Sequence, residues 1–130
     1  MLVPSKMNSE ILYARLLSFA KQGQKLVFKL PKNIYNFEYS SQFIRSSSSS
    51  GANYIEAIEA ISPKDFVYRL KICRKESKES IHWLNLIKNA NSNLDEIQKE
   101  CEDLISEAME FIRIFSSSIL TSERNLQMKK

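Results

Sequence analysis

Glycine and proline are scarce in this sequence, which contains two glycines and three prolines among 130 residues. β-Sandwiches, barrels and Rossmann-type sheets need a turn every few residues, and these two residue types form most turns. Their scarcity argues against such folds and favours helices. Because 43% of the residues are hydrophobic and 26% are charged, we expect one compact core and therefore one domain.

Long apolar runs are absent as well. No stretch approaches the roughly 18 uninterrupted apolar residues of a membrane span, and the N-terminal segment MLVPSKMNSE lacks the apolar centre of a secretory signal. We therefore expect a cytoplasmic protein that has no membrane partner. Cys73 and Cys101 allow at most one disulfide, and without a secretion signal we expect two reduced thiols.

The sequence also lacks the patterns that carry familiar chemistry. His82 is the only histidine, and there is no Gly-x-Ser-x-Gly elbow and no Cys-x-x-Cys pair. Neither glycine belongs to a phosphate-binding loop. The sequence therefore predicts no catalytic residue, metal ligand, cofactor or small-molecule substrate, and a protein that is not an enzyme.

Three breaks divide the chain into four segments with helical apolar periodicity. They lie at Pro31, at Ser62-Pro63 and at residues 89–93. Ser62 is suited to cap the third helix, and Pro63 is suited to its first turn. We predict an all-α, antiparallel up-and-down four-helix bundle over residues 8–120, with helices at about 9–29, 34–61, 63–90 and 93–120. Residues 1–7 are expected to be a flexible N-terminus and residues 121–130 a polar C-terminal tail.

The second segment contains five consecutive serines, residues 46–50, followed by Gly51. This composition is typical of a flexible linker. Against that interpretation, Phe37, Ile44, Gly51 and Ile58 repeat every seven residues across the run. We interpret the run as helix whose small side chains permit close backbone approach, with a linker as the alternative.

Basic residues are concentrated in the first three segments. Residues 1–90 hold fourteen basic and seven acidic side chains, whereas residues 91–130 hold five basic and eight acidic ones. A nucleic-acid surface is predicted from cations that share one side of the third helix, together with lysines of the first: Lys64, Lys71, Arg74, Lys75 and Lys78, with Lys21, Lys25 and Lys29. The alternative is an ordinary solvated face, in which Glu76 and Glu79 are interleaved and Glu79 pairs with Lys75.

The third segment carries a second set of apolar residues that lies off its main stripe. These are Val67, Ile72, Trp83 and Leu86. A helix with apolar residues on two sides is either central or in contact with another subunit. We therefore predict a homo-oligomer with these four residues at the subunit interface.

Residues 30–87 contain four motifs with characteristic spacing. They are Ser41-Gln42-x-Ile44-Arg45-Ser46, Gly51-Ala52-Asn53-Tyr54-x-Glu56-Ala57, Ser62-x-Lys64-Asp65-Phe66 and Lys75-Glu76-x-x-Glu79-x-x-x-Trp83-Leu84. With these motifs the chain resembles the bacterial four-helix-bundle family first known as the intervening-sequence protein of large-subunit ribosomal RNA. It departs from the family by having serines at 46, 47, 48 and 50, and the loss of an apolar residue at Ser50 weakens the expected packing there.

The resemblance implies an up-and-down bundle, ring-like homopentamers and no catalysis. A related branch, the accessory variability determinant of diversity-generating retroelements, binds nucleic acid and a reverse transcriptase. Arg45, Asn53 and Glu56 fall on the family's polar signature, and we expect them to form a buried hydrogen-bonded network that sets helix register.

These observations predict a non-catalytic homo-oligomeric adaptor, pentameric by the resemblance. It would bind RNA or DNA, or a nucleic-acid enzyme such as a reverse transcriptase, through its basic surface. The alternative is a protein-interaction scaffold that binds no nucleic acid and uses the apolar surface around Val67, Ile72 and Trp83.

Overall fold

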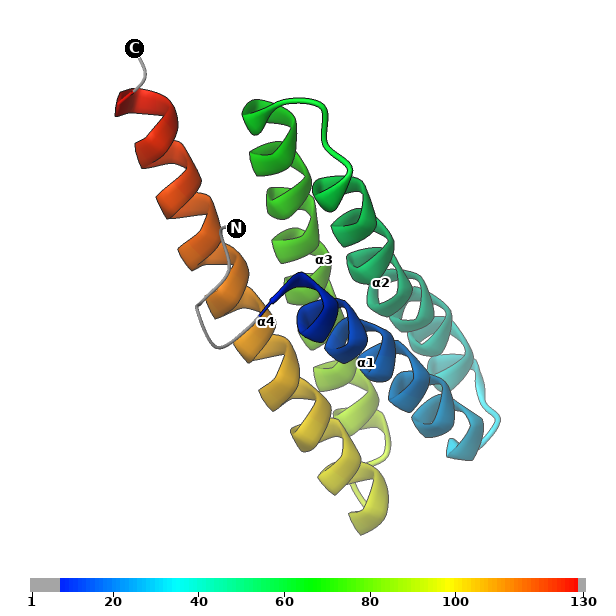
Figure 1. Cartoon of the computed structure of the whole chain (residues 1–130). Coiled ribbons are helices and arrows are strands. Elements are labelled where there is room, and N and C mark those ends of the chain that lie inside the picture. Colours follow the sequence, from blue (N-terminus) through cyan, green and yellow to red (C-terminus); the bar gives the residue numbers. More distant parts are fainter. Residues whose placement is uncertain (1–7, 129–130) are drawn as a thin grey trace.

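The computed structural model describes residues 8–128, and these form four α-helices without a β-strand. The helices are α1 (Ser9–Lys29), α2 (Ile34–Ile58), α3 (Pro63–Ala90) and α4 (Asp95–Met128). They run alternately up and down and pack side by side, with α1 and α3 on opposite sides of the bundle (Figure 1). The predicted all-α four-helix bundle is confirmed. The flexible N-terminus that the sequence predicts at residues 1–7 lies outside the described residues.

Local side-chain caps determine where the first three helices begin. Each cap is a side-chain oxygen that accepts a hydrogen bond from an amide three residues later, which satisfies one of the unpaired donors of the first turn. The caps are Asn8 to Ile11 at 2.9 Å, Asn33 to Asn36 at 2.9 Å and Ser62 to Asp65 at 3.1 Å. The start of α3 therefore agrees with the Ser62-Pro63 signal.

Two helix ends differ from the predicted ones. α2 ends at Ile58 rather than 61, because Pro63 favours an extended conformation at Ser62 and the chain uses residues 59–62 to reverse direction. α4 continues to Met128, so the predicted polar tail at 121–130 is helical as far as that residue. Ile119 and Ser122 are buried and Leu126 packs on the core, so the helix-spaced contact face continues beyond residue 120.

The core lies along the bundle axis and draws aromatic rings from three helices. Phe19 of α1 meets Phe43 of α2 and Phe111 of α4 edge-on, with ring centroids 6.2 and 5.4 Å apart. Cys73 and Cys101 are buried here as free thiols, as the sequence predicts. Burial raises their pKa values to about 12 and about 11. No helix within residues 8–128 is both long and apolar enough to span a membrane.

The serine run is helix, so the helical interpretation is confirmed and the linker interpretation is wrong. Three of its serines are buried: Ser46 and Ser50 bond to α3, and Ser47, beside Gly23 of α1, donates to the Ile44 carbonyl. Ser46 Oγ lies 2.9 Å from Ser80 Oγ, and Ser50 Oγ lies 3.2 Å from both Ser77 Oγ and the Cys73 carbonyl oxygen. Hydroxyl pairs thus replace the apolar contact expected at Ser50, and they satisfy polar groups that burial would otherwise leave unpaired.

Close backbone approach occurs at Gly23 of α1 rather than at Gly51. A Cβ built on Gly23 would lie 2.8 Å from Cε2 of Phe43, whereas one on Gly51 would lie at an ordinary 3.7 Å from Cβ of Leu16. Gly23 is therefore the small residue that the tight contact with Phe43 of α2 requires.

Candidate nucleic-acid interface

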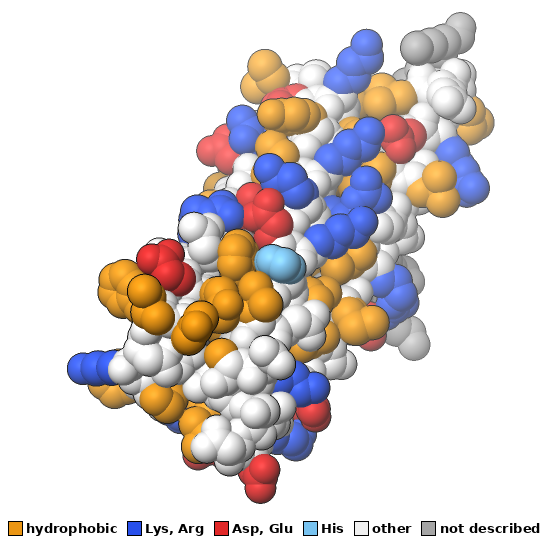
Figure 2. Space-filling view, turned by 180° about the vertical axis from the view of Figure 1, so that it is seen from behind, with side chains coloured by type: hydrophobic (Ala, Val, Ile, Leu, Met, Phe, Trp, Pro, Cys, Tyr) orange, Lys and Arg blue, Asp and Glu red, His pale blue; other side chains and the backbone are white. Residues whose placement is uncertain are grey.

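The side of α3 that faces away from the rest of the bundle carries a concentration of cations. Positions separated by three, four and seven residues recur on one side of a helix, and here that side is solvent-exposed. Figure 2 shows Lys and Arg side chains gathered on the upper half of this side. We call this surface the α3 basic face and define it by five of the predicted residues: Lys64, Lys71, Arg74, Lys75 and Lys78.

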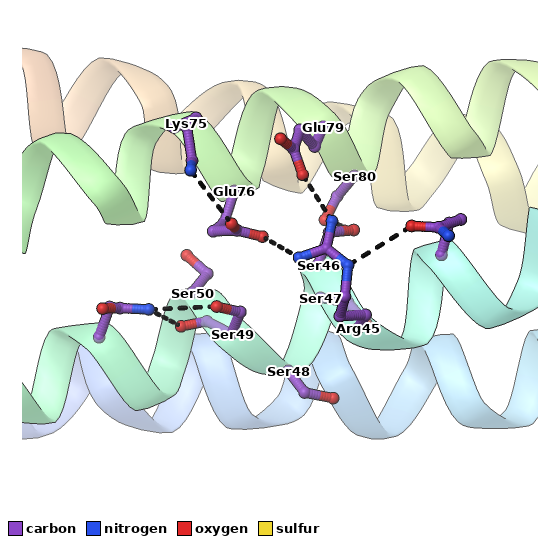
Figure 3. A network of polar contacts seen from close by, with 12 residues as sticks. Arg45, Ser46, Ser47, Ser48, Ser49, Ser50, Lys75, Glu76, Glu79 and Ser80 are labelled. Atoms are coloured by element: carbon purple, nitrogen blue, oxygen red, sulfur yellow. Dashed lines mark hydrogen bonds and ion pairs between the residues drawn. The ribbon is translucent and has the colours of Figure 1, made fainter.

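Two of the three acidic residues of α3, Glu76 and Glu79, are bound by Arg45 of α2. Its guanidinium donates to Glu79 at 2.8 Å and to the buried Glu76 at 3.4 Å (Figure 3). The hydrogen bond to Glu79, partly offset by desolvation, raises the pKa of Arg45 above its ordinary value. The expected Lys75–Glu79 pair is not formed, and Lys75 instead lies 3.9 Å from Glu76. Arg45 and Lys75 together compensate the two glutamates, so Lys75 is the one cation of the face that pairs with an acid of α3 among the described residues.

Two members of the α3 basic face have partners on α4. Lys71 forms an ion pair with Glu123 at 3.2 Å, and Arg74 donates to Ser116 Oγ at 3.3 Å. Both members of the Lys71 pair are about half exposed, and such pairs contribute only about 0–1 kcal/mol. Lys64 and Lys78 make no ion pair within residues 8–128. A phosphate can therefore compete for this surface at little cost.

The lysines predicted on the first helix do not join the α3 basic face, because α1 makes no contact with α3 within the described chain. Lys29 instead pairs with Glu96 and Glu100 of α4, each at 3.0 Å, and the hydrogen bond to Glu96 is the main reason that its pKa is raised. Lys25 lines a small hollow with Glu100. Lys21 is exposed on the same helix. The grouping of these three lysines with the third-helix cations is corrected by the structure.

The polar signature of the sequence bridges α2 and α3 at the surface instead of inside the core. Arg45 is half exposed. Asn53 donates to the Ser49 carbonyl at 2.9 Å and accepts from Arg69 of α3 at 3.3 Å. Glu56 is exposed and makes no hydrogen bond or ion pair with the described residues. The expectation of a buried network is therefore wrong, and Glu56 has no place in the bridge.

The apolar residues predicted at a subunit interface are mostly used within the chain. Val67 is only 6% exposed and belongs to the core, so its assignment to an interface is wrong. Ile72, Trp83 and Leu86 are half-buried. The ring centroid of Trp83 lies 6.3 Å from that of Tyr39 on α2. The second apolar set of α3 is thus explained largely by packing against its neighbours.

A more exposed apolar surface lies on α2. We call it the α2 outer stripe, and it includes no charged side chain. Its residues are Ile34, Phe37, Ser41, Ile44, Ser48, Ile55 and Ile58. They are spaced alternately by three and four residues when the buried Gly51 is counted between Ser48 and Ile55. Phe37 is 75% exposed and, with Ile44, lines a groove of about 560 Å³ against the end of α1. The seven-residue repeat that indicates a helical serine run in the sequence also signals this stripe.

Comparisons with known proteins place these features in context. A family model described as 23S rRNA-intervening sequence protein matches residues 9–114. A solved structure from Bacteroides thetaiotaomicron, described as a protein of unknown function from the S23 ribosomal protein family, is similar with a TM-score of 0.76 and 29% sequence identity. That similarity covers 87% of this chain and 98% of the other. No match was found among curated proteins.

Proposed function

This chain belongs to the 23S rRNA-intervening sequence protein family, and from that premise we propose that it is a non-catalytic homo-oligomeric adaptor. It binds nucleic acid, alone or held by a nucleic-acid enzyme such as a reverse transcriptase, through the α3 basic face. The subunit number is five, as the family resemblance implies.

The observation that carries this proposal is the excess of positive charge on this side of α3. Arg45 pairs with Glu79 and shares Glu76 with Lys75, while Lys64, Arg74 and Lys78 make no ion pair within residues 8–128. Lys71, Lys75 and Lys78 follow one another at about 6 and 4.5 Å along the helix axis. Successive cations at this spacing suit the successive phosphates of one strand. Cations that replace condensed counterions give binding that weakens steeply with salt.

Self-association through the α2 outer stripe supports the same function. Apolar residues spaced alternately by three and four form the seam by which helices of different chains pack. The stripe borders α1, which makes no contact with α3, so a second copy can cover the stripe and leave the α3 basic face exposed. Repetition of the face around an oligomer raises the effective affinity for one long nucleic acid.

Charge reversal tests the nucleic-acid proposal. Lys75→Glu/Lys78→Glu is compared with Lys21→Glu/Lys25→Glu, which changes the net charge equally on α1. Binding of a fluorescein-labelled structured RNA is followed by anisotropy from low to high salt. The α3 variant is expected to bind at least about tenfold more weakly and to lower the slope of log affinity against log salt by roughly 1.5, because two phosphate contacts are lost. Unchanged binding, or equal loss in both variants, would refute the proposal.

Light scattering on the eluting peak of a sizing column tests the oligomer. Phe37→Ser removes an exposed ring from the α2 outer stripe, and Phe28→Ser removes a still more exposed ring from α1. We expect the first variant to lower the mass toward that of a monomer and the second to leave it unchanged. A wild-type chain that elutes as a monomer contradicts the homo-oligomeric part of the proposal.

A further inference from the structure

Three aromatic rings form a row across the groove between α2 and α3. Neighbouring centroids, Tyr35 to Tyr39 and Tyr39 to Trp83, are each 6.3 Å apart, and the rings are inclined by 37° and 31°. The ring of His82 lies 4.7 Å from that of Trp83, at its edge. We call Tyr35, Tyr39 and Trp83 the aromatic row.

The aromatic row is open to solvent. Tyr35 is 62% exposed, Tyr39 and Trp83 are half-buried, and His82 is exposed. Full burial in the core would have hidden these rings, as it hides Phe43. Tyr35 thus presents most of its surface to a planar ligand, and Tyr39 and Trp83, which pack against the core, present part of theirs.

The row continues the α3 basic face. On α3, His82 follows Lys78 by one turn and shares its side. Trp83, five residues or about 7.5 Å beyond that lysine, lies on the side of Glu76 and Glu79 and meets Tyr39 of α2. In Figure 2, orange side chains lie beside the pale blue histidine, with blue cations and a red acidic side chain above them. A strand whose phosphates lie on the cations therefore reaches the rings with its next nucleotides.

We infer that this combined surface binds unpaired nucleic acid, with bases stacked on Tyr35, Tyr39 and Trp83 and phosphates held by Lys75 and Lys78. Aromatic rings beside a cationic track bind single strands in this way, because every base presents a flat face. The bases of a duplex already stack on one another and offer the rings nothing comparable. This inference rests on the proposed function and names its substrate class as single-stranded RNA or DNA.

Trp83 is the only tryptophan of the chain, so its fluorescence reports directly on the row. The full-length protein is titrated with a 15-nucleotide oligouridylate, a duplex of the same length and an abasic oligomer with the same number of phosphates. We expect the oligouridylate to quench Trp83 and to bind at least tenfold more tightly than the duplex. The abasic oligomer should bind through its phosphates without quenching.

A variant pair separates base stacking from folding. Tyr35→Leu removes the most exposed ring of the row, and Phe28→Leu removes a ring that is 92% exposed on α1. Only Tyr35→Leu should reduce the preference for the single strand, by about three- to tenfold, while both variants keep the helical circular dichroism signal.

The outcomes distinguish the two proposals. If none of the oligomers binds, the proposed function fails and this inference fails with it. If all three bind alike and Trp83 is not quenched, the proposed function stands and the stacking inference is overturned. It is also overturned if Trp83 fluorescence responds to dilution of the protein but not to oligonucleotide, because a second copy of the chain then covers the row.

Discussion

The two glycines provide a matched test of how closely α1 and α2 pack. Both lie inside helices, and neither has a positive φ, so alanine fits the backbone at each position. Alanine at a helix interior stabilises by about 0.5–1 kcal/mol relative to glycine. The two sites differ only in what an added Cβ would meet.

Gly51→Ala is expected to stabilise the fold. The nearest atom to the new Cβ, Cβ of Leu16, lies at 3.7 Å, which is an ordinary contact. The full helix-propensity gain of about 0.5–1 kcal/mol should therefore remain, which raises the melting temperature by roughly 2–5 °C for a domain of this size.

Gly23→Ala is expected to destabilise the fold despite the same propensity gain. The new Cβ would lie 2.8 and 3.1 Å from Cε2 and Cζ of Phe43. That ring is fully buried and packed on Phe19, so it cannot turn away without disturbing the core. Overpacking costs about 1–3 kcal/mol, which leaves a net loss of up to roughly 2 kcal/mol.

Urea unfolding followed by circular dichroism measures both variants, at one protein concentration because self-association adds to apparent stability. Opposite signs support the reasoning. If Gly23→Ala stabilises as much as Gly51→Ala, the close α1–α2 contact at Gly23 is refuted. If Gly51→Ala destabilises even at low concentration, the open contact at Gly51 is refuted.

Three further predictions concern charge, titration and the end of α4. Arg45→Met should destabilise by about 1–2 kcal/mol in urea unfolding, because Glu76 stays buried without its main cation, and an unchanged midpoint would contradict this. Both thiols should resist Ellman's reagent at pH 8 in the native state and react in urea. Burial raises their pKa values from 9.0 to about 12 and about 11, so the free energy of unfolding should fall as pH rises above about 9. Constant stability up to pH 11 would disprove this prediction. Leu126→Ala should lower the melting temperature while exposed Gln127→Ala does not, and equal melting temperatures would contradict packing beyond residue 120.

The parts of the fold that depend on neighbouring residues were predictable. Ser62 and Pro63 set the start of α3 through one cap and one missing donor, and both act within a single turn. The serine run was read correctly as helix because the apolar repeat from Phe37 to Ile58 continues through it. Helical periodicity and capping are local properties, so the sequence alone contains them.

The candidate site was only partly predictable for a related reason. The side shared by Lys64, Lys71, Lys75 and Lys78 follows from helix geometry. The net charge on that side does not follow from helix geometry, because Glu79 can pair either with Lys75 on α3 or with Arg45 on α2. Only the packed neighbour decided between these partners.

By itself the sequence determined four helices, their alternating direction, the Ser62 cap that starts α3 and the side of α3 that carries the cations. The tertiary structure alone decided that Val67 is core, that the α2 outer stripe is surface, and that Lys29 faces α4 instead of the α3 basic face. Apolar and charged periodicity defines the sides of a helix, but which side meets a neighbour depends on contacts between residues that are far apart along the chain.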